Sequence, residues 1–216
     1  GSEMCIRDRR GAITPDEIAA YTDLMAESQG FVADDILDAY DVRQHRWLMD
    51  VGGGDGSFLR SAGRRAPQLQ LSLVDLPPVV ERARHRFDAA GMGGRVTLHG
   101  HDFQNDALPT GADLVSLVRV AHDHDDPVVE RLLAAIHQAL PPGGTLILAE
   151  PMAGIAGAEA MADAYFGLYL WAMGTGRARS PEILISMLKQ AGFASASPIP
   201  THRPLLTALI VAKKAA

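Results

Sequence analysis

The sequence predicts an α/β fold built on a doubly wound sheet of seven strands, with an antiparallel last strand. From Trp47 onward, short apolar segments alternate with helical ones, which is typical of a parallel sheet with crossover helices. A glycine-rich turn, "MDVGGGDGSF", follows the first apolar segment. The last two apolar segments are joined only by "IPTHRP", too short for a parallel crossover, so the final strand should run antiparallel. The expected fold is Rossmann-like.

The composition fits one large domain with a substantial core. The chain has 216 residues, 47% of them hydrophobic, and a net charge of −6 from 20 basic and 26 acidic residues. It has neither a run of about 20 apolar residues, which a membrane span needs, nor a long basic patch. We therefore expect no transmembrane segment and no nucleic-acid partner. The single cysteine, Cys5, excludes an internal disulfide and suits the cytoplasm.

Two helices are expected ahead of the sheet. Residues 1–9 show no apolar periodicity, and we interpret them as a non-native leader. A helix over 14–28 would begin with Thr14 as its N-cap and Pro15 at its first position. A second helix is expected over 32–40. We interpret residues 10–45 as the remnant of a helical N-terminal region.

The main domain is predicted to cover residues 46–216. Its strands are expected at 47–52, 70–75, 95–100, 113–118, 144–149, 193–198 and 205–212. Its helices are expected at 57–65, 77–90, 127–139, 157–173 and 181–191. Glycine and proline turns such as "GMGG", "LPPGG" and "AGF" separate them.

The glycine turn favours a cationic ligand. A dinucleotide site would have G-x-G-x-x-G, but Ser57 stands where the third glycine should be. Asp55 inside the turn, and Asp50 before it, would repel a pyrophosphate. Both suit a ligand with an ammonium and a sulfonium, as in S-adenosylmethionine. The alternatives are a nicotinamide-dependent oxidoreductase, or a tight connection without a ligand.

Two further positions fit the same cofactor. Asp75 ends the second expected strand, 19 residues after Gly56, where a carboxylate can accept the hydroxyls of a ribose. Asp102 and Phe103 follow the third strand, where an acid and a ring can hold an adenine. Asp75 alone would also suit a helix N-cap.

A histidine and acid cluster, "AHDHDD", follows the fourth strand. Loops at the carboxyl ends of parallel strands carry the chemistry of such sheets. His122 is a candidate general base, with Asp123 and Glu150 to orient its ring. A metal is the alternative, although adjacent loop residues chelate one ion poorly. We interpret Asp125 and Asp126 as N-capping residues before Pro127.

Several motifs together resemble the bacterial and plant small-molecule O-methyltransferases. They are "LMDVGGGDGSFL", "LVDLPPVV", "VRVAHDHDD", "ALPPGGTLILAEP" and "GRARSPEILISMLKQAGF", and the resemblance covers residues 14–212. The string "DAYFGLYLWAMGTGRARSPE" looks most like the carotenoid members, the hydroxyneurosporene and demethylspheroidene O-methyltransferases. The implied fold is that of class I methyltransferases. The implied cofactor is S-adenosylmethionine, without a metal.

The resemblance implies a role for each motif. The glycine turn would cradle the methionine part of the cofactor, Asp75 the ribose, and Asp102 with Phe103 the adenine. The implied cofactor-binding residues are Asp50, Gly52, Gly53, Gly54, Gly56, Asp75, Leu76, Asp102, Phe103 and Arg119. His122 matches the catalytic base, flanked by Asp123 and Glu150. The implied acceptor pocket includes Met25, Ser28, Tyr169 and Met173; for the last two, packing within a helix is the alternative.

The chain also departs from the family pattern. Plant members have a lysine four residues before the histidine, where Val118 stands here, with Arg119 next to it. They also have a second glutamate in a G-K-E-R-T string, where this chain has Ala178. Of the helical N-terminal dimerisation domain of the family, only the last helices are expected. The full-length protein is expected to be a homodimer.

The predicted function is methyl transfer to a hydroxyl of a small apolar molecule, a hydroxylated carotenoid on the subfamily resemblance. The expected location is cytoplasmic, and peripheral to membranes if the acceptor is a carotenoid. The alternatives are C-methylation of a pigment or another small ring, and a catalytically silent cofactor-binding module.

Overall fold

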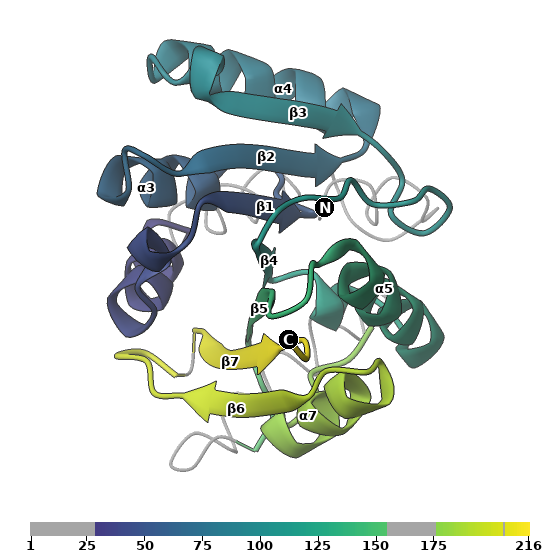
Figure 1. The fold of residues 1–216 in the computed structure, drawn as a ribbon. Helices are drawn as coiled ribbons and strands as arrows, with labels where there is room; N and C mark the ends of the chain where they lie inside the picture. The colour runs from purple at the N-terminus through teal and green to yellow at the C-terminus, as the bar shows by residue number, and fades with distance from the viewer. Residues whose placement is uncertain (1–28, 155–175, 205) are drawn as a thin grey trace, which may run out of the picture.

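The computed structural model describes residues 29–154 and 176–216, except residue 205 (Figure 1). The helices expected at 14–28 and 157–173 lie outside the described residues. Residues 29–39 are helical, so the second expected helix is present and ends one residue earlier than predicted.

Seven strands form one mixed sheet. They are β1 (Trp47–Val51), β2 (Gln70–Asp75), β3 (Val96–Gly100), β4 (Leu114–Val118), β5 (Thr145–Glu150), β6 (Ser195–Ile199) and β7 (Ala208–Lys213). The order across the sheet is β3-β2-β1-β4-β5-β7-β6. Neighbours among β1 to β5 run parallel, whereas β7 runs antiparallel to both β5 and β6. The predicted seven-stranded sheet with an antiparallel last strand is therefore confirmed.

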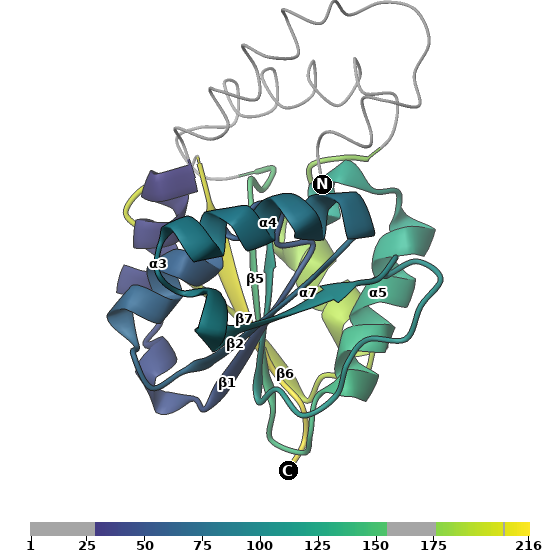
Figure 2. The same ribbon diagram turned by 90° about the horizontal axis from the view of Figure 1, so that it is seen from above.

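Helices cover both faces of this sheet. In the part of the chain that the structure describes, the α-helices that follow β1 are α3 (Ser57–Arg65), α4 (Pro77–Ala89), α5 (Asp126–Ala139) and α7 (Pro181–Gln190). Figure 2 shows α3 on one side of the sheet and α5 with α7 on the other. Leu59 of α3 and Phe87 of α4 belong to one buried cluster, and Ile136 of α5 and Leu188 of α7 to another. The sheet is doubly wound, as predicted.

Element boundaries follow local hydrogen bonding. Helix α7 begins where predicted because the Ser180 side chain caps it, accepting from the Ile183 N–H at 3.5 Å, and Pro181 follows. Strand β6 begins two residues later than predicted, because the Phe193 N–H donates to the Leu188 carbonyl and still closes α7. Strand β7 begins at Ala208, three residues later than predicted, because the N–H groups of Leu206 and Thr207 both donate to the Arg203 carbonyl.

The first five strands end at a common edge, which Figure 1 shows by the arrowheads of β1, β2 and β3. The glycine turn, Asp75 and Glu150 all lie at that edge, at the ends of β1, β2 and β5. Within the described ranges, no helix has the length and apolar character needed to cross a membrane.

Candidate active site and cofactor site

The glycine turn between β1 and α3 needs left-handed backbone. Gly52, Gly54 and Gly56 have φ of 69°, 58° and 78°, a region that residues with a side chain rarely adopt. A Cβ at Gly52 would lie 2.7 Å from a methyl group of Val120, whereas a Cβ at Gly54 would meet nothing within 4 Å. One side of the turn is thus packed against the β4 loop. At Gly54 the turn faces open space.

Asp75 joins this turn to the end of β2. Its Oδ2 accepts the Gly54 N–H at 2.9 Å, and its Oδ1 accepts the Leu76 N–H at 2.8 Å. The residue is only 3% exposed. A carboxylate offers about four acceptor positions, so Asp75 can accept further bonds while holding the turn.

Asp50 lies beneath the turn and is 1% exposed. The Ser116 hydroxyl donates to its Oδ1 at 2.6 Å, and its Oδ2 has no hydrogen-bond partner within the described part of the chain. Burial raises the pKa of Asp50 to about 7, opposed by the Ser116 bond and assisted by the charge of Asp75. Asp50 is therefore partly protonated at neutral pH. Ser116, in the middle of β4, was not among the predicted site residues.

Asp102 and Phe103 follow β3, as expected. The Asp102 carboxylate accepts the Gln104 N–H at 2.9 Å and the Asn105 side-chain amide at 2.7 Å, so it shapes its own loop. The Phe103 ring meets the His124 ring edge to face, with centroids 5.4 Å apart. This ring contact connects the loop after β3, which is predicted to hold the adenine, to the loop after β4, which carries the histidines.

His122 lies between the two predicted acids. Its Nδ1 is 2.6 Å from Glu150 Oε2, and its Nε2 is 3.3 Å from Asp123 Oδ1. All three residues are buried, and His122 is 5% exposed. The residues come from the short 3₁₀ turn η3 (Ala121–Asp123) and from the end of β5.

Glu150 also holds the backbone that carries the histidine. Its Oε1 accepts the N–H groups of Val120 at 2.9 Å and Ala121 at 2.7 Å. Burial lowers the pKa of His122, but the charges of Asp123 and Glu150 outweigh it and raise the pKa above its usual value. The two carboxylates thus favour the charged imidazolium.

Arg119 lies at the end of β4 with φ of 57°, an uncommon conformation for a residue with a side chain. Its N–H donates to the Ala149 carbonyl at 2.8 Å. Its charge opposes the protonation of His122. Such local strain is often found where the chain positions functional groups.

The prediction that the Asp125 and Asp126 side chains cap the following helix is wrong. Asp125 occupies the N-cap position of α5, but its side chain makes no capping bond and accepts the Gly176 N–H at 3.0 Å instead. Helix α5 begins at Asp126, whose carboxylate binds Arg177 and Arg179. Both acids therefore join the histidine loop to the segment before α7. No sequence pattern in that segment had indicated a site residue.

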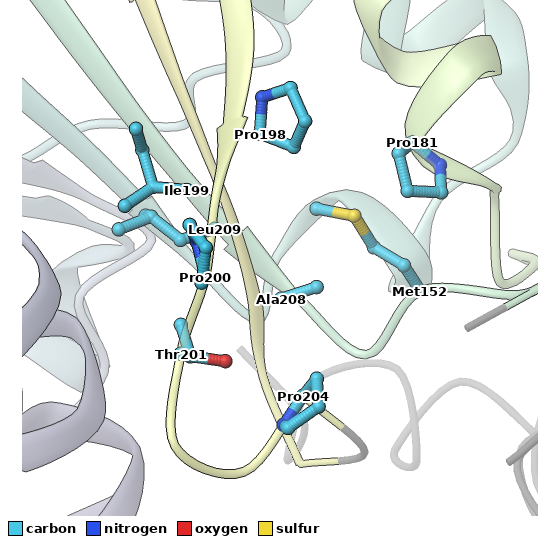
Figure 3. Close-up of a pocket in the computed structure, with 9 residues that line it drawn as sticks. All are labelled: Met152, Pro181, Pro198, Ile199, Pro200, Thr201, Pro204, Ala208 and Leu209. Carbon is cyan, nitrogen blue, oxygen red and sulfur yellow. The ribbon is translucent and has the colours of Figure 1, made fainter. Parts of the chain in front are cut away.

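An apolar cavity of about 220 Å³ lies beside this edge of the sheet (Figure 3). Its apolar lining includes Met152, Pro181, Pro198, Ile199, Ala208 and Leu209. Figure 3 shows the Met152 side chain extending toward Ala208 and Pro198. Ala208 pairs with Glu150 across β5 and β7, so one wall of the cavity is formed by the strand next to the one that ends in Glu150.

The four predicted acceptor residues, Met25, Ser28, Tyr169 and Met173, lie outside the described residues. The described site therefore consists of the glycine turn, the acids at the strand ends, the His122 loop and the apolar cavity.

Comparison with known proteins gives this site a context. A family model described as an O-methyltransferase domain matches residues 10–194. The chain is 46% identical, over 202 residues, to the demethylspheroidene O-methyltransferase of Cereibacter sphaeroides, covering 94% of this chain and 53% of that protein. The enzyme of that name from Rhodobacter capsulatus is 47% identical over 194 residues, which are 90% of this chain and 48% of that protein.

A solved structure shows the same fold with a ligand. The crystal structure of human N-acetylserotonin methyltransferase in complex with S-adenosylmethionine matches with a TM-score of 0.78 at 25% identity. The match covers 94% of this chain and 57% of that one. The chain thus spans about half the length of the curated relatives it matches.

Proposed function

Because the chain belongs to the O-methyltransferase family, whose cofactor is S-adenosylmethionine, we propose that it methylates a hydroxyl of a small apolar acceptor with His122 as general base. The observation that carries the proposal is the 2.6 Å contact between His122 Nδ1 and Glu150. This contact orients a buried imidazole at the sheet edge where such folds bind ligands.

The described residues fit the cofactor. The turn is open at Gly54, where a Cβ would meet no atom within 4 Å. Asp75 has acceptor positions left for the two ribose hydroxyls, and the Asp75 carboxylate, with the partly ionised Asp50, places negative charge beneath a cationic ligand. Phe103 offers an apolar face for the adenine. When bound, S-adenosylmethionine supplies a methyl group activated by its sulfonium.

His122 then acts at one defined atom. With Nδ1–H donating to Glu150, Nε2 is the acceptor for the proton of the hydroxyl. Nε2 would take the proton from the acceptor oxygen as that oxygen bonds the methyl carbon, while the bond from that carbon to the sulfonium sulfur would break and leave a neutral thioether. The proton stays on Nε2 as the imidazolium. Asp123 and Glu150 stabilise that charged ring. The role of Glu150 resembles that of the acid in a catalytic triad, which orients the histidine and stabilises its positive charge.

We propose a hydroxylated carotenoid as the acceptor. Two relatives at 46% and 47% identity are demethylspheroidene O-methyltransferases. The apolar cavity, which is lined in part by β7, supports an acceptor with a long hydrocarbon part, because apolar walls favour such a chain over water. Met25, Ser28, Tyr169 and Met173 are proposed to complete the acceptor pocket. We further propose a homodimer in the cytoplasm, peripheral to the membrane where the acceptor is dissolved.

The test is product analysis with the full-length protein. Purified protein is incubated with methyl-labelled S-adenosylmethionine and either demethylspheroidene or its O-methylated product. Label should enter demethylspheroidene as a methyl ether, identified by mass spectrometry. The methylated product, which lacks the hydroxyl, is the control and should take up none. Label on carbon, or no label in either compound, would overturn the proposal.

A further inference from the structure

Arg179 is a buried arginine bound to the loop that carries His122. The residue is 2% exposed. Its Nη1 donates to the Ala121 carbonyl at 2.8 Å, and its Nη2 donates to the His124 carbonyl at 2.7 Å. These two carbonyls bracket His122 and Asp123 in the sequence. One guanidinium therefore holds the loop on both sides of the histidine.

The turn η3 lies between two charged groups. The Ala121 N–H donates to Glu150 Oε1, while the Ala121 carbonyl accepts from Arg179. The loop backbone is thus bound by an anion through its N–H groups and by a cation through its carbonyls. Hydrogen bonds to charged groups are stronger than those between neutral groups. The loop should be rigid at the point where the His122 ring departs from it.

Asp126 and Gly176 complete the arrangement. Asp126 Oδ1 accepts from Arg179 Nε at 2.9 Å and from Nη2 at 2.7 Å, and so compensates the buried charge. Gly176 has φ of 81°, and a Cβ there would collide with the His122 carbonyl and lie 2.7 Å from the Asp123 carbonyl carbon. The segment before α7 therefore packs directly against the backbone of His122.

We propose that Arg179 is a positioning residue for the reaction: it fixes the His122 loop so that Nδ1 stays on Glu150 and Nε2 faces the acceptor. This inference rests on the proposed function of His122. Arg179 does not touch the reacting atoms itself. Its planar fork reaches two carbonyls and a carboxylate in fixed directions, which the single ammonium of a lysine cannot reproduce.

The experiment compares Arg179→Gln and Arg179→Lys with Arg177→Gln. Arg177 is the matched control, because it also binds Asp126, at 3.1 Å through Nε, while its side chain makes no hydrogen bond to the described residues of the His122 loop. In the full-length protein, the His122 ring is titrated by NMR with labelled histidine, and its signal is assigned with His122→Gln. The Kd for S-adenosylhomocysteine, kcat and KM are measured in parallel.

A displaced His122 ring and a lost positive charge would shift the pKa of His122 in opposite directions. Loss of a nearby cation alone would raise the pKa of His122, whereas loss of the Glu150 contact would lower it. We expect both Arg179 variants to titrate at lower pH than wild type and to lose about 10- to 100-fold in kcat, since small displacements are costly in catalysis. The Kd for S-adenosylhomocysteine should change less than about threefold, and Arg177→Gln should match wild type.

A wild-type titration of His122 in a folded Arg179→Lys protein would overturn the proposal. Arg179→Lys keeps the positive charge, so it separates an effect on the position of the His122 ring from an effect of charge, even if Arg179→Gln fails to fold. An upward shift in Arg179→Gln together with a wild-type Arg179→Lys would show a charge effect alone, which also overturns it. Normal turnover of His122→Gln would instead overturn the proposed role of His122 as general base. The titration of the His122 ring would still test whether Arg179 positions that ring.

Discussion

Glu150 binds both the side chain of His122 and the backbone that carries it. One carboxylate oxygen lies 2.6 Å from His122 Nδ1, and the other accepts the N–H groups of Val120 and Ala121. This double attachment ties the ring and its loop to the end of β5. Nε2, which lies 3.3 Å from Asp123 Oδ1, is the nitrogen that we propose acts on the acceptor.

Replacing His122 with glutamine should lower kcat by about 10²- to 10⁴-fold, the usual contribution of a general base. The Kd for S-adenosylhomocysteine should stay within a few fold, because His122 is not among the residues that hold the glycine turn. Steady-state kinetics of the full-length enzyme and calorimetry measure the two quantities.

His124→Ala is the control for this change. The His124 ring packs edge to face on Phe103, and burial lowers its pKa, so it is a packing residue in the structure. Its variant should lose much less kcat. A larger loss of kcat in His124→Ala than in His122→Gln would identify His124, rather than His122, as the general base.

Asp123→Asn should change the pH dependence of turnover. The base must be neutral to accept a proton, so kcat should rise as pH rises through the pKa of His122. Burial lowers that pKa, and the charges of Asp123 and Glu150 raise it above its usual value. Removing the Asp123 charge should therefore move the acidic limb of the pH–kcat profile to lower pH. A profile that stays in place would show that another group limits the rate.

The sequence predicted the sheet well because strong local signals mark its elements. Glycines with left-handed backbone end β1, and Pro77 and Pro181 begin α4 and α7. The same signals brought the glycine turn, Asp75 and the His122 loop to one edge, since parallel strands end on the same side. Boundaries without such a signal, as at the starts of β6 and β7, were displaced by two or three residues.

The sequence could not predict contacts between segments distant in the chain. Ser116 has the apolar neighbours of an ordinary buried strand, and only folding places its hydroxyl on Asp50. Arg179 lies 58 positions from the Ala121 carbonyl that it binds, and nothing in "GRARS" marks one arginine as buried and the other as exposed. Asp125 showed the pattern of a cap, but a tertiary contact with Gly176 uses its side chain instead.

Asp75→Ala should weaken binding of S-adenosylhomocysteine by roughly 1.5–3 kcal/mol, the range for hydrogen bonds to a charged group. The variant also loses the bond to the Gly54 N–H, so its thermal stability without ligand must be measured in parallel. Glu81→Ala is the matched control, because Glu81 is an exposed acid one turn into α4. Calorimetry should give a wild-type Kd for that control. Unchanged binding by Asp75→Ala would remove Asp75 from the cofactor site.

Asp50→Asn should change how stability depends on pH. Burial raises the pKa of folded Asp50 to about 7, so between about pH 4 and 7 the folded protein holds a proton that the unfolded chain has lost. The stability contributed by this group therefore falls as pH rises through that window and is constant above it. The full effect is on the order of 4 kcal/mol, since one pKa unit corresponds to about 1.4 kcal/mol.

Urea unfolding at several pH values measures this effect. The free energy of unfolding of Asp50→Asn should fall less between pH 5 and 8 than that of the wild type, because asparagine does not titrate. Asp102→Asn is the control, because it makes the same substitution at a partly exposed loop residue. Parallel pH curves for wild type and Asp50→Asn would contradict the raised pKa.

Ala208→Leu should distinguish acceptors by the length of their apolar part. The added side chain would enter the cavity between Met152 and Pro198 and displace hydrocarbon from it. Excluding two or three methylene groups, each worth about 0.8 kcal/mol, should raise KM for a long hydroxylated carotenoid by about 10- to 50-fold. A short hydroxylated acceptor that does not reach the cavity should keep its KM. Because Ala208 lies opposite Glu150 in the sheet, the His122 titration must be shown to be unchanged.

Ala194→Leu, the same substitution at an exposed position before β6, is the matched control and should leave both KM values as in wild type. The measurement is the ratio of the two KM values in full-length enzyme saturated with cofactor, so that a general loss of activity cancels. An equal rise for the long and the short acceptor would mean that the substitution disturbs the active site itself. An unchanged ratio would place the hydrocarbon chain outside the cavity, because a bulkier wall cannot enter an occupied space without cost.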